Sequence, residues 1–133
     1  MKIAICGSMA FANEMHTTKK LLEELGHTVQ TPGDLERFIL SIVTVEDKWK
    51  KIDRDALKEY YGVISCHDAV LVLNYDKNNV PNYVGGSTLI EIGFAYVLDK
   101  KIFLLNPIPH LSYTDEIAAT KPHILYGDLK QIA

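Results

Sequence analysis

The chain has 133 residues, of which 47% are hydrophobic and 23% charged, and its formal net charge is −3. This length and balance are typical of one globular domain with a real core, so we take residues 1–133 as a single domain. The net negative charge offers no basic surface for nucleic acid, and no apolar run approaches the roughly 20 residues of a membrane span.

The start of the chain and its cysteines indicate a cytoplasmic protein. The opening MKIAICGSMA holds an apolar run that is too short for the core of a signal peptide. Cys6 and Cys66 lack metal or redox spacing, and we expect both to be buried, reduced thiols. The five histidines are scattered, so the sequence implies no metal site and no other cofactor.

The first third of the chain predicts a strand, a helix and a second strand. Residues 2–6 form a continuous apolar run, as in a strand buried on both faces, and residues 27–31 alternate as a shorter strand does. The helix should start after Gly7 and Ser8 and stop at Gly26. The side chains that we expect on its buried face are Met15, Leu21, Leu22 and Leu25.

The next segment, residues 33–45, is ambiguous, because its apolar patches fit a lid over a ligand as well as a packed connection. A helical stripe follows in residues 46–65, and residues 69–74 read as a central buried strand. The helix of residues 87–99 is almost wholly apolar, so we expect it to be heavily buried. The last elements predicted are a strand at 102–105, a helix at 114–119 with Thr114 as its N-cap, and a strand at 124–126.

Strands and helices thus alternate, which predicts an α/β fold with helices on both faces of a parallel sheet. Right-handed crossovers favour a flavodoxin-like, doubly wound sheet of five strands in the order 2-1-3-4-5. It is not the dinucleotide-binding variant, since the first turn contains one glycine, Gly7, where that fingerprint needs three.

Ligands of such sheets bind beyond the carboxyl ends of the strands, where the strand order reverses. Asp68 precedes the third strand, so we expect a structural role for it at the opposite edge. The side chains and glycines expected at the ligand edge are Gly7, Ser8, Met9, Gly85, Gly86, Ser87 and Asn106.

Glu91 is the one acid of the apolar helix and has two interpretations. Thr88-Leu89-Ile90-Glu91 fits a capping box, in which the glutamate bonds back to the backbone of Thr88. The alternative is a carboxylate in a mostly apolar cleft, available for nucleophilic or acid–base chemistry. Gly85-Gly86 is not needed for a cap and would let a ligand approach the backbone.

Three segments together resemble the nucleoside 2-deoxyribosyltransferase superfamily, which includes the nucleoside 5′-monophosphate N-glycosidases. They are CGSM at residues 6–9, HDAVLVLN at 67–74 and GGSTLIEIGFAYVLDKKIFLL at 85–105. The most specific part is EIGFA at residues 91–95, followed by the Lys100-Lys101-Ile102 strand start. The resemblance covers most of the chain in the order and type of its elements.

The resemblance implies that Glu91 is a nucleophile that attacks the anomeric carbon and displaces the base, as in retaining glycosidases. It places Gly7 and Ser8 beside the sugar or phosphate. It places Thr114 where phosphate-specific members have a serine from a neighbouring subunit, in a family that is commonly dimeric or larger. One departure is Tyr60, eight residues before Asp68, where deoxyribose-specific members carry an aspartate.

We therefore expect an N-glycosidase or deoxyribosyltransferase-like enzyme acting on a small nucleoside or nucleotide, assembled as a homodimer or higher homo-oligomer. Asp34, Asp76 and Tyr60 are all candidates for the acid that protonates the leaving base, and Tyr60 is also a candidate substrate contact. The alternative is a non-catalytic nucleotide-binding or sensor module of the same fold, in which Glu91 is only a cap.

Overall fold

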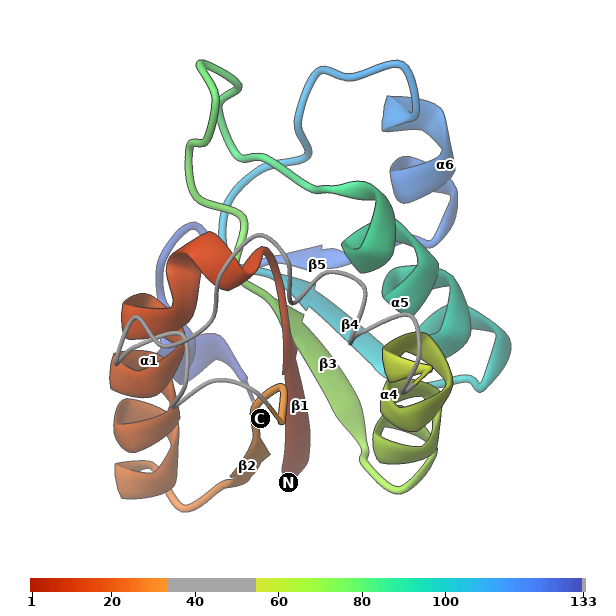
Figure 1. Ribbon diagram of the computed structural model, residues 1–133. Helices are drawn as coiled ribbons and strands as arrows, with labels where there is room; N and C mark the ends of the chain where they lie inside the picture. Colours follow the sequence, from red (N-terminus) through yellow and green to blue (C-terminus); the bar gives the residue numbers. More distant parts are fainter. Residues whose placement is uncertain (34–54, 133) are drawn as a thin grey trace.

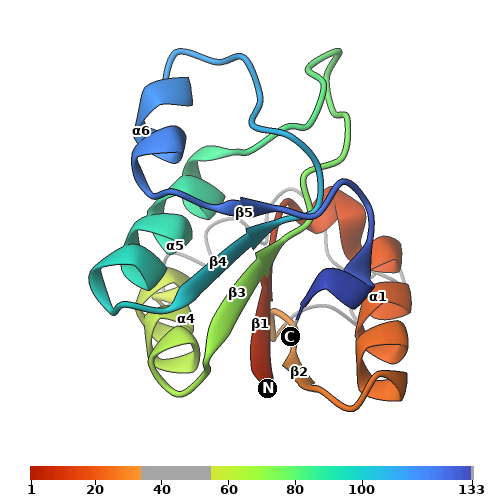
Figure 2. The same ribbon diagram turned by 180° about the vertical axis from the view of Figure 1, so that it is seen from behind.

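The computed structural model describes residues 1–33 and 55–132, and Figures 1 and 2 show their arrangement from two sides. Strands and helices alternate along these two ranges, as the sequence predicts. The elements are β1 (Lys2–Cys6), η1 (Met9–Phe11), α1 (Ala12–Glu24), β2 (Thr28–Gln30), α4 (Ala56–Ser65), β3 (Ala69–Val72), α5 (Gly86–Val97), β4 (Lys101–Leu104), α6 (Thr114–Ala119), β5 (His123–Ile124) and η2 (Leu129–Gln131).

The five strands form one parallel sheet in the order β2-β1-β3-β4-β5, which confirms the predicted topology. β3 is a central strand, because it pairs with β1 on one side and β4 on the other. Its register with β1 places Cys6 opposite Val72, at the carboxyl ends of both strands. The strand order reverses between β1 and β3, so a ligand site is expected beyond these two ends.

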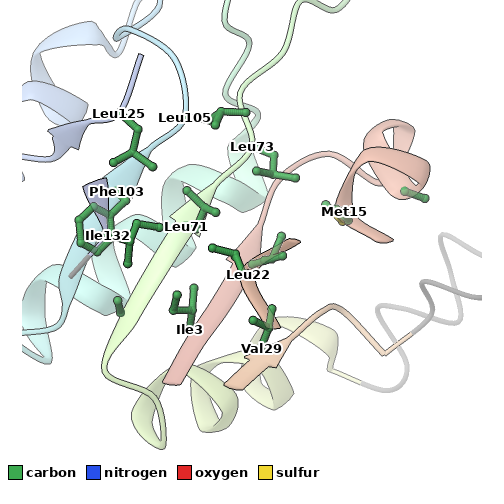
Figure 3. Packing of buried hydrophobic residues seen from close by; sticks show 13 residues of the cluster. Ile3, Met15, Leu22, Val29, Leu71, Leu73, Phe103, Leu105, Leu125 and Ile132 are labelled. Carbon is green, nitrogen blue, oxygen red and sulfur yellow. The ribbon is translucent and has the colours of Figure 1, made fainter. Parts of the chain in front are cut away.

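Alternate residues of each strand pack against opposite helix layers. Ile3 and Ile5 of β1 belong to the hydrophobic cluster under α1, which Figure 3 shows together with Met15 and Leu22 of that helix. The C-terminal segment completes this layer through Leu129 and Ile132, and Figure 2 shows it beside α1. The other cluster lies under α4, α5 and α6; its strand members are Ala4, Cys6, Val70, Val72, Ile102 and Leu104.

Helix α1 has a different buried face from the one expected. Met15 and Leu22 are buried as predicted, but Leu21 and Leu25 are 45% and 46% exposed. A short 3-10 turn, η1, precedes the helix, so α1 begins only at Ala12. Its sheet-facing stripe then contains Ala12 and Thr18 together with Met15 and Leu22, and this stripe turns Leu21 and Leu25 outward.

Helix α5 is less covered than its composition suggested. Its fully buried residues are Thr88, Ile92 and Ala95, which face the sheet. On its outer side Ile90, Tyr96 and Val97 are large and exposed, with Val97 79% exposed. The prediction of heavy burial was therefore wrong within the described chain, and an apolar helix face is left on the surface.

Other expectations are met in part. α4 confirms the end of the predicted helix at residues 46–65, with Tyr60 and Ile64 buried, while residues 46–54 lie outside the described ranges. Both cysteines are free, but only Cys6 is buried; Cys66, at the exposed end of α4, is not. Among the described helices, none is long and apolar enough to cross a lipid bilayer.

Candidate functional site

The backbone at the end of β1 requires a glycine. Gly7 has φ +153°, a conformation that residues with a β-carbon rarely adopt. A β-carbon there would also lie 3.0 Å from the carbonyl oxygen of Leu73 and 3.3 Å from the Met15 methyl group. β1 therefore turns tightly into η1, and this turn carries Ser8 and the half-buried Met9 at the ligand edge.

Glu91 does not occupy a capping position. α5 begins at Gly86 with Gly85 as its N-cap, which has no side chain to cap with. A capping-box glutamate stands three residues after the N-cap, where this helix has Thr88, so Glu91 lies one turn too far along. The capping-box interpretation was wrong because the helix starts before Thr88 rather than at it. Glu91 is half-buried, between the buried Thr88 and Ile92 in sequence.

The Glu91 carboxylate lies against the end of β1. It is close enough to the thiol of Cys6, which is fully buried, to affect the pKa of that thiol. Burial raises the pKa of Cys6 well above its usual value, and the charge of Glu91 and its hydrogen bond raise it further. Cys6 therefore stays a neutral thiol.

Tyr60 of α4 lies near the same two side chains, Cys6 and Glu91. Its side chain is 7% exposed, and its hydroxyl donates to the backbone carbonyl of Ile5, next to Cys6. Burial, followed by the nearby Cys6 and Glu91, raises the pKa of Tyr60 well above its usual value, so the phenol stays neutral. Cys6, Tyr60 and Glu91 thus meet at one place, although they come from a strand and two helices.

A second group lies at the Ser8 turn. The ammonium of Lys77, in the loop after β3, is 2.8 Å from the Ser8 hydroxyl oxygen, to which it donates. The backbone N–H of Ala10 donates to the same oxygen at 3.2 Å. Lys77 was not expected at the site, although it is the one basic residue of the loop at 73–85 and could have been found from that.

That loop forms a small arm. Lys77 and Val80 pair as an antiparallel bridge, and the Tyr83 N–H donates to the Tyr75 carbonyl at 2.8 Å. Asp76, a candidate leaving-group acid, is exposed and accepts a 3.0 Å hydrogen bond from the Asn82 N–H, which closes the turn. In Figures 1 and 2 the arm projects beyond the carboxyl edge of the sheet.

The two glycines after the arm differ in their surroundings. A β-carbon on Gly85 would lie 3.2 Å from the ring and hydroxyl of Tyr83, so the arm itself lies against this position. Gly86 has open space within 4 Å among the described residues. Ser87 follows as an exposed residue of the first turn of α5.

Asn106 is paired with Asn74 across the ends of β4 and β3. The amide of Asn74, which is fully buried, donates to the carbonyls of Asn106 and Pro107 and accepts from the Asn106 N–H. The Asn106 amide donates back to the Asn74 carbonyl at 3.1 Å. Asn106 also borders a hollow along α1, so the structure groups it with that helix rather than with Glu91.

Thr114 has another role than the predicted one. The N-cap of α6 is Tyr113, and Thr114 is the first helical residue. Its hydroxyl accepts from the Leu111 N–H at 2.7 Å and lies 2.8 Å from the Pro109 carbonyl, so it fixes the loop before the helix. The N-cap prediction was wrong because the helix starts one residue earlier than a Thr114 cap requires.

Asp68 lies at the opposite edge, as the edge rule predicts. Its carboxylate accepts a 2.8 Å hydrogen bond from the Lys2 N–H, which ties the start of β1 to the start of β3. That backbone hydrogen bond lowers the pKa of Asp68, and the nearby N-terminus, Lys2 and Lys100 add to the effect.

Within residues 1–33 and 55–132, two surface hollows stand out, and Glu91 borders neither of them. One, of about 540 Å³, lies at the starts of β4 and β5 and includes Lys100, Lys101, Lys121 and His123. The other, of about 440 Å³, follows α1 on the far side of the sheet from α5. Asp34, the remaining candidate acid, lies outside the described residues, as does the ambiguous segment at 33–45 except for Gly33.

We found no match when the chain was compared with protein-family models, with curated proteins and with solved structures. The function therefore has to be inferred from the fold and from the residues gathered at the carboxyl edge of the sheet.

Proposed function

We propose that this protein cleaves the N-glycosidic bond of a nucleoside or nucleoside 5′-monophosphate, with Glu91 as the nucleophile. The observation that carries the proposal is the place of Glu91. Its carboxylate lies at the reversal point of the strand order, beside Cys6 and Tyr60, in the second turn of α5 where capping cannot explain it. The likeness of residues 6–9, 67–74 and 85–105 to the nucleoside 2-deoxyribosyltransferase superfamily supports the same assignment.

The reaction needs a carboxylate nucleophile, and two of the described side chains near Glu91 are neutral. Cys6 and Tyr60 are both held in their protonated forms, so neither competes with Glu91 as a base or nucleophile. In the reaction, a Glu91 oxygen bonds to the anomeric carbon while the bond to the base breaks, and the electron pair leaves with the base. Water, or a second base, then attacks the same carbon and releases Glu91, so the configuration at that carbon is retained.

A phosphate end on the substrate is favoured by the Ser8–Lys77 pair. The Ser8 oxygen already accepts from Lys77 and from Ala10, so both of its acceptor positions are used and its proton is free to donate outward. Lys77 contributes a positive charge at the same point. A serine proton beside an ammonium is well suited to an anionic oxygen, so we favour 5′-monophosphates over free nucleosides.

The other candidate is a non-catalytic nucleotide-binding module. It keeps the Ser8–Lys77 contacts but gives Glu91 no chemical role. Tyr60 favours this candidate, because a buried phenol that donates to the Ile5 carbonyl cannot replace the carboxylate expected at that position. The two candidates differ in one measurable result, which is the release of free base.

The test is incubation of the protein with a panel of nucleosides and their 5′-monophosphates, followed by chromatography of the free base. We expect release from at least one monophosphate, and a loss of roughly 10³-fold or more in Glu91→Gln, since that variant lacks the nucleophile but keeps the shape. Glu116→Gln, at an exposed acid of α6, is the matched control and should leave the rate unchanged.

The outcomes separate the two candidates. Base release that persists in Glu91→Gln removes Glu91 from its role. Binding of a monophosphate without release of base from any member of the panel supports the binding module instead.

We also propose that the protein is a homodimer or higher homo-oligomer. Its support is the apolar surface on α4 and α5, which lie side by side and join through an edge-to-face contact of Tyr61 with Phe94 at 5.2 Å. A second copy would remove such a surface from water. Val97→Asp should then lower the mass measured by light scattering to that of a monomer. If the variant has the same mass as the wild type, this surface is not the interface between copies. The exposed side chains are Leu57, Tyr61, Ile90, Tyr96 and Val97.

A further inference from the structure

The hollow of about 540 Å³ lies where α5 and α6 end and β4 and β5 begin, and Glu91 does not line it. Pockets of this size take small molecules. Among the described residues that line it, three are lysines, Lys100, Lys101 and Lys121, and one is an acid, Asp99. Because the whole chain has a net charge of −3, this local excess of positive charge runs against its composition. A hollow lined mainly by one sign of charge attracts ions of the opposite sign.

Lys121 stands at a position that its helix would fill better with glycine. It follows Thr120, the C-cap of α6, and has φ +53°. Glycine is favoured in this left-handed conformation just after a C-cap, and a residue with a β-carbon there costs stability. The end of the helix is already closed, because the Lys121 N–H donates to the Ala118 carbonyl at 3.0 Å. The Thr120 hydroxyl likewise donates to the Ile117 carbonyl at 2.7 Å. The backbone therefore does not explain why residue 121 is a lysine.

The end of α5 is closed in a similar way. Asp99, which follows the C-cap Leu98, has φ +59°. Its N–H donates to the Tyr96 carbonyl at 3.1 Å, and the Lys100 N–H donates to the Ala95 carbonyl at 2.8 Å. These are the two bonds of a Schellman motif, so the last carbonyls of this helix also have backbone partners and do not need a lysine side chain.

His123 borders the same hollow and is held in one orientation. The Gln131 amide nitrogen donates to the Leu125 carbonyl at 2.8 Å, so the amide oxygen is the atom that faces His123. That oxygen lies 3.1 Å from Nε2 and can only accept, so Nε2 carries a hydrogen and donates it. The Phe103 ring meets the imidazole edge to face, with 5.8 Å between the ring centres. When the imidazole is protonated, Nδ1 also carries a hydrogen that it can donate to an anion.

We propose that this hollow binds a small organic phosphate, with Lys121 and His123 as its main contacts. A phosphate group presents several anionic oxygens, so it can accept from an ammonium and an imidazolium at the same time. The exposed ring of Tyr96 also lines the hollow and offers an apolar surface to the organic part of the ligand. This site is separate from that of the proposed glycosidase, and neither depends on the other.

Binding can be followed without any catalytic activity. In ¹H–¹⁵N NMR spectra, ADP should shift the amides of Thr120, Lys121 and His123. The titration uses the Lys77→Ala variant, so that a phosphate held by Ser8 and Lys77 cannot account for the shifts. Citrate, a carboxylate anion, is the comparison probe and should shift the same amides much less. Equal shifts with ADP and citrate, or no shift with either, overturn the proposal.

Lys121→Gly should change stability and binding in opposite directions. Glycine relieves the left-handed backbone, so the melting temperature should rise, while loss of the ammonium should weaken ADP binding by about tenfold or more. Lys20→Ala removes the same charge from an exposed position of α1 and should alter neither quantity. A more stable protein that binds ADP less well cannot be explained by damage to the fold. If Lys121→Gly binds ADP as the wild type does, the proposal fails.

Asp99→Asn tests the charge of the hollow from the other side. Asparagine tolerates the left-handed conformation as aspartate does, so the fold should be kept. Removing the one acid among the described lining residues should tighten ADP binding by about threefold. Unchanged or weaker binding in this variant would mean that the positive charge of the hollow does not hold the ligand.

Discussion

The ammonium of Lys77 donates to the hydroxyl of Ser8 across 69 residues of sequence. The same ammonium lies 5.2 Å from the centre of the Tyr83 ring, so the base of the arm and the turn after β1 are joined through one cation. The contact puts a positive charge beside the one hydroxyl of the Gly7–Ser8 turn.

Lys77→Ala should therefore weaken the use of monophosphates. We expect KM for a 5′-monophosphate to rise by roughly tenfold or more, the value of a lost hydrogen bond to a charged group, while the corresponding nucleoside is little affected. Steady-state kinetics with both substrates check this. Lys130→Ala, at an exposed lysine of η2, is the control. An equal loss for nucleoside and monophosphate would mean that Lys77 does not contact a phosphate.

The two glycines at the start of α5, Gly85 as N-cap and Gly86 as first helical residue, should respond differently to alanine. In Gly85→Ala the new methyl group meets the Tyr83 ring at 3.2 Å, so the arm must shift, at a cost of about 1 kcal/mol in the free energy of unfolding. Gly86→Ala has room and places a better helix former in the first turn, which should stabilise the protein by about 0.5 kcal/mol.

Urea unfolding of both variants measures this difference. In a Tyr83→Ala background the cost of Gly85→Ala should disappear, because the obstructing ring is gone. A cost that is the same in both backgrounds would place the strain elsewhere.

Features of this fold that depend on local sequence patterns could be predicted, whereas those that depend on contacts between distant residues could not. The sheet order follows from short, buried strands and from the handedness of crossovers, both of which a single sequence displays. The start of α5 cannot be predicted in this way, because any residue of GGST at 85–88 could begin the helix. Only the folded backbone shows that Gly85 is the N-cap. The difference of three residues between Gly85 and Thr88 as N-cap removes the capping-box explanation of Glu91.

Long-range contacts were the part that sequence could not supply. Glu91 was identified from its neighbours in the chain, but it lies near Cys6, a residue 85 positions away in the sequence. Lys77 contacts Ser8 through a loop with no periodic pattern. The exposed side of α5 was missed for another reason: apolar residues indicate that a surface will be covered, not what will cover it.

The Asn74 side chain should be among the most sensitive polar positions. Its amide is fully buried and makes three hydrogen bonds between the ends of β3 and β4. Asn74→Ala leaves two carbonyls and an N–H without partners, which should destabilise the fold by about 3 kcal/mol. Calorimetry should show a fall in melting temperature of roughly 10 °C. Asn13→Ala, at an exposed position of α1, should change it by less than about 2 °C.

Asp68 should contribute to the acid sensitivity of the protein. Its pKa is lowered in the folded state, so its ionised form favours folding at pH values above the unfolded pKa, near 4, and this contribution is lost as the pH falls through the lower folded pKa. The melting temperature of Asp68→Asn should thus lie below that of the wild type by a constant amount above about pH 5 and converge with it in stronger acid. Parallel curves down to pH 2 would show that the charge is not involved.

The order of the strands also bears on synthesis. β1 is synthesised before the other strands of the sheet, yet its second neighbour, β3, follows more than 60 residues later, and Glu91 later still. A nascent chain that stops before α5 already has α4 but lacks part of the cover over this side of the sheet, because Ala4 and Cys6 belong to a layer that α4, α5 and α6 close together. Limited proteolysis of truncated chains that end before and after α5 should therefore show protease resistance only in the longer ones.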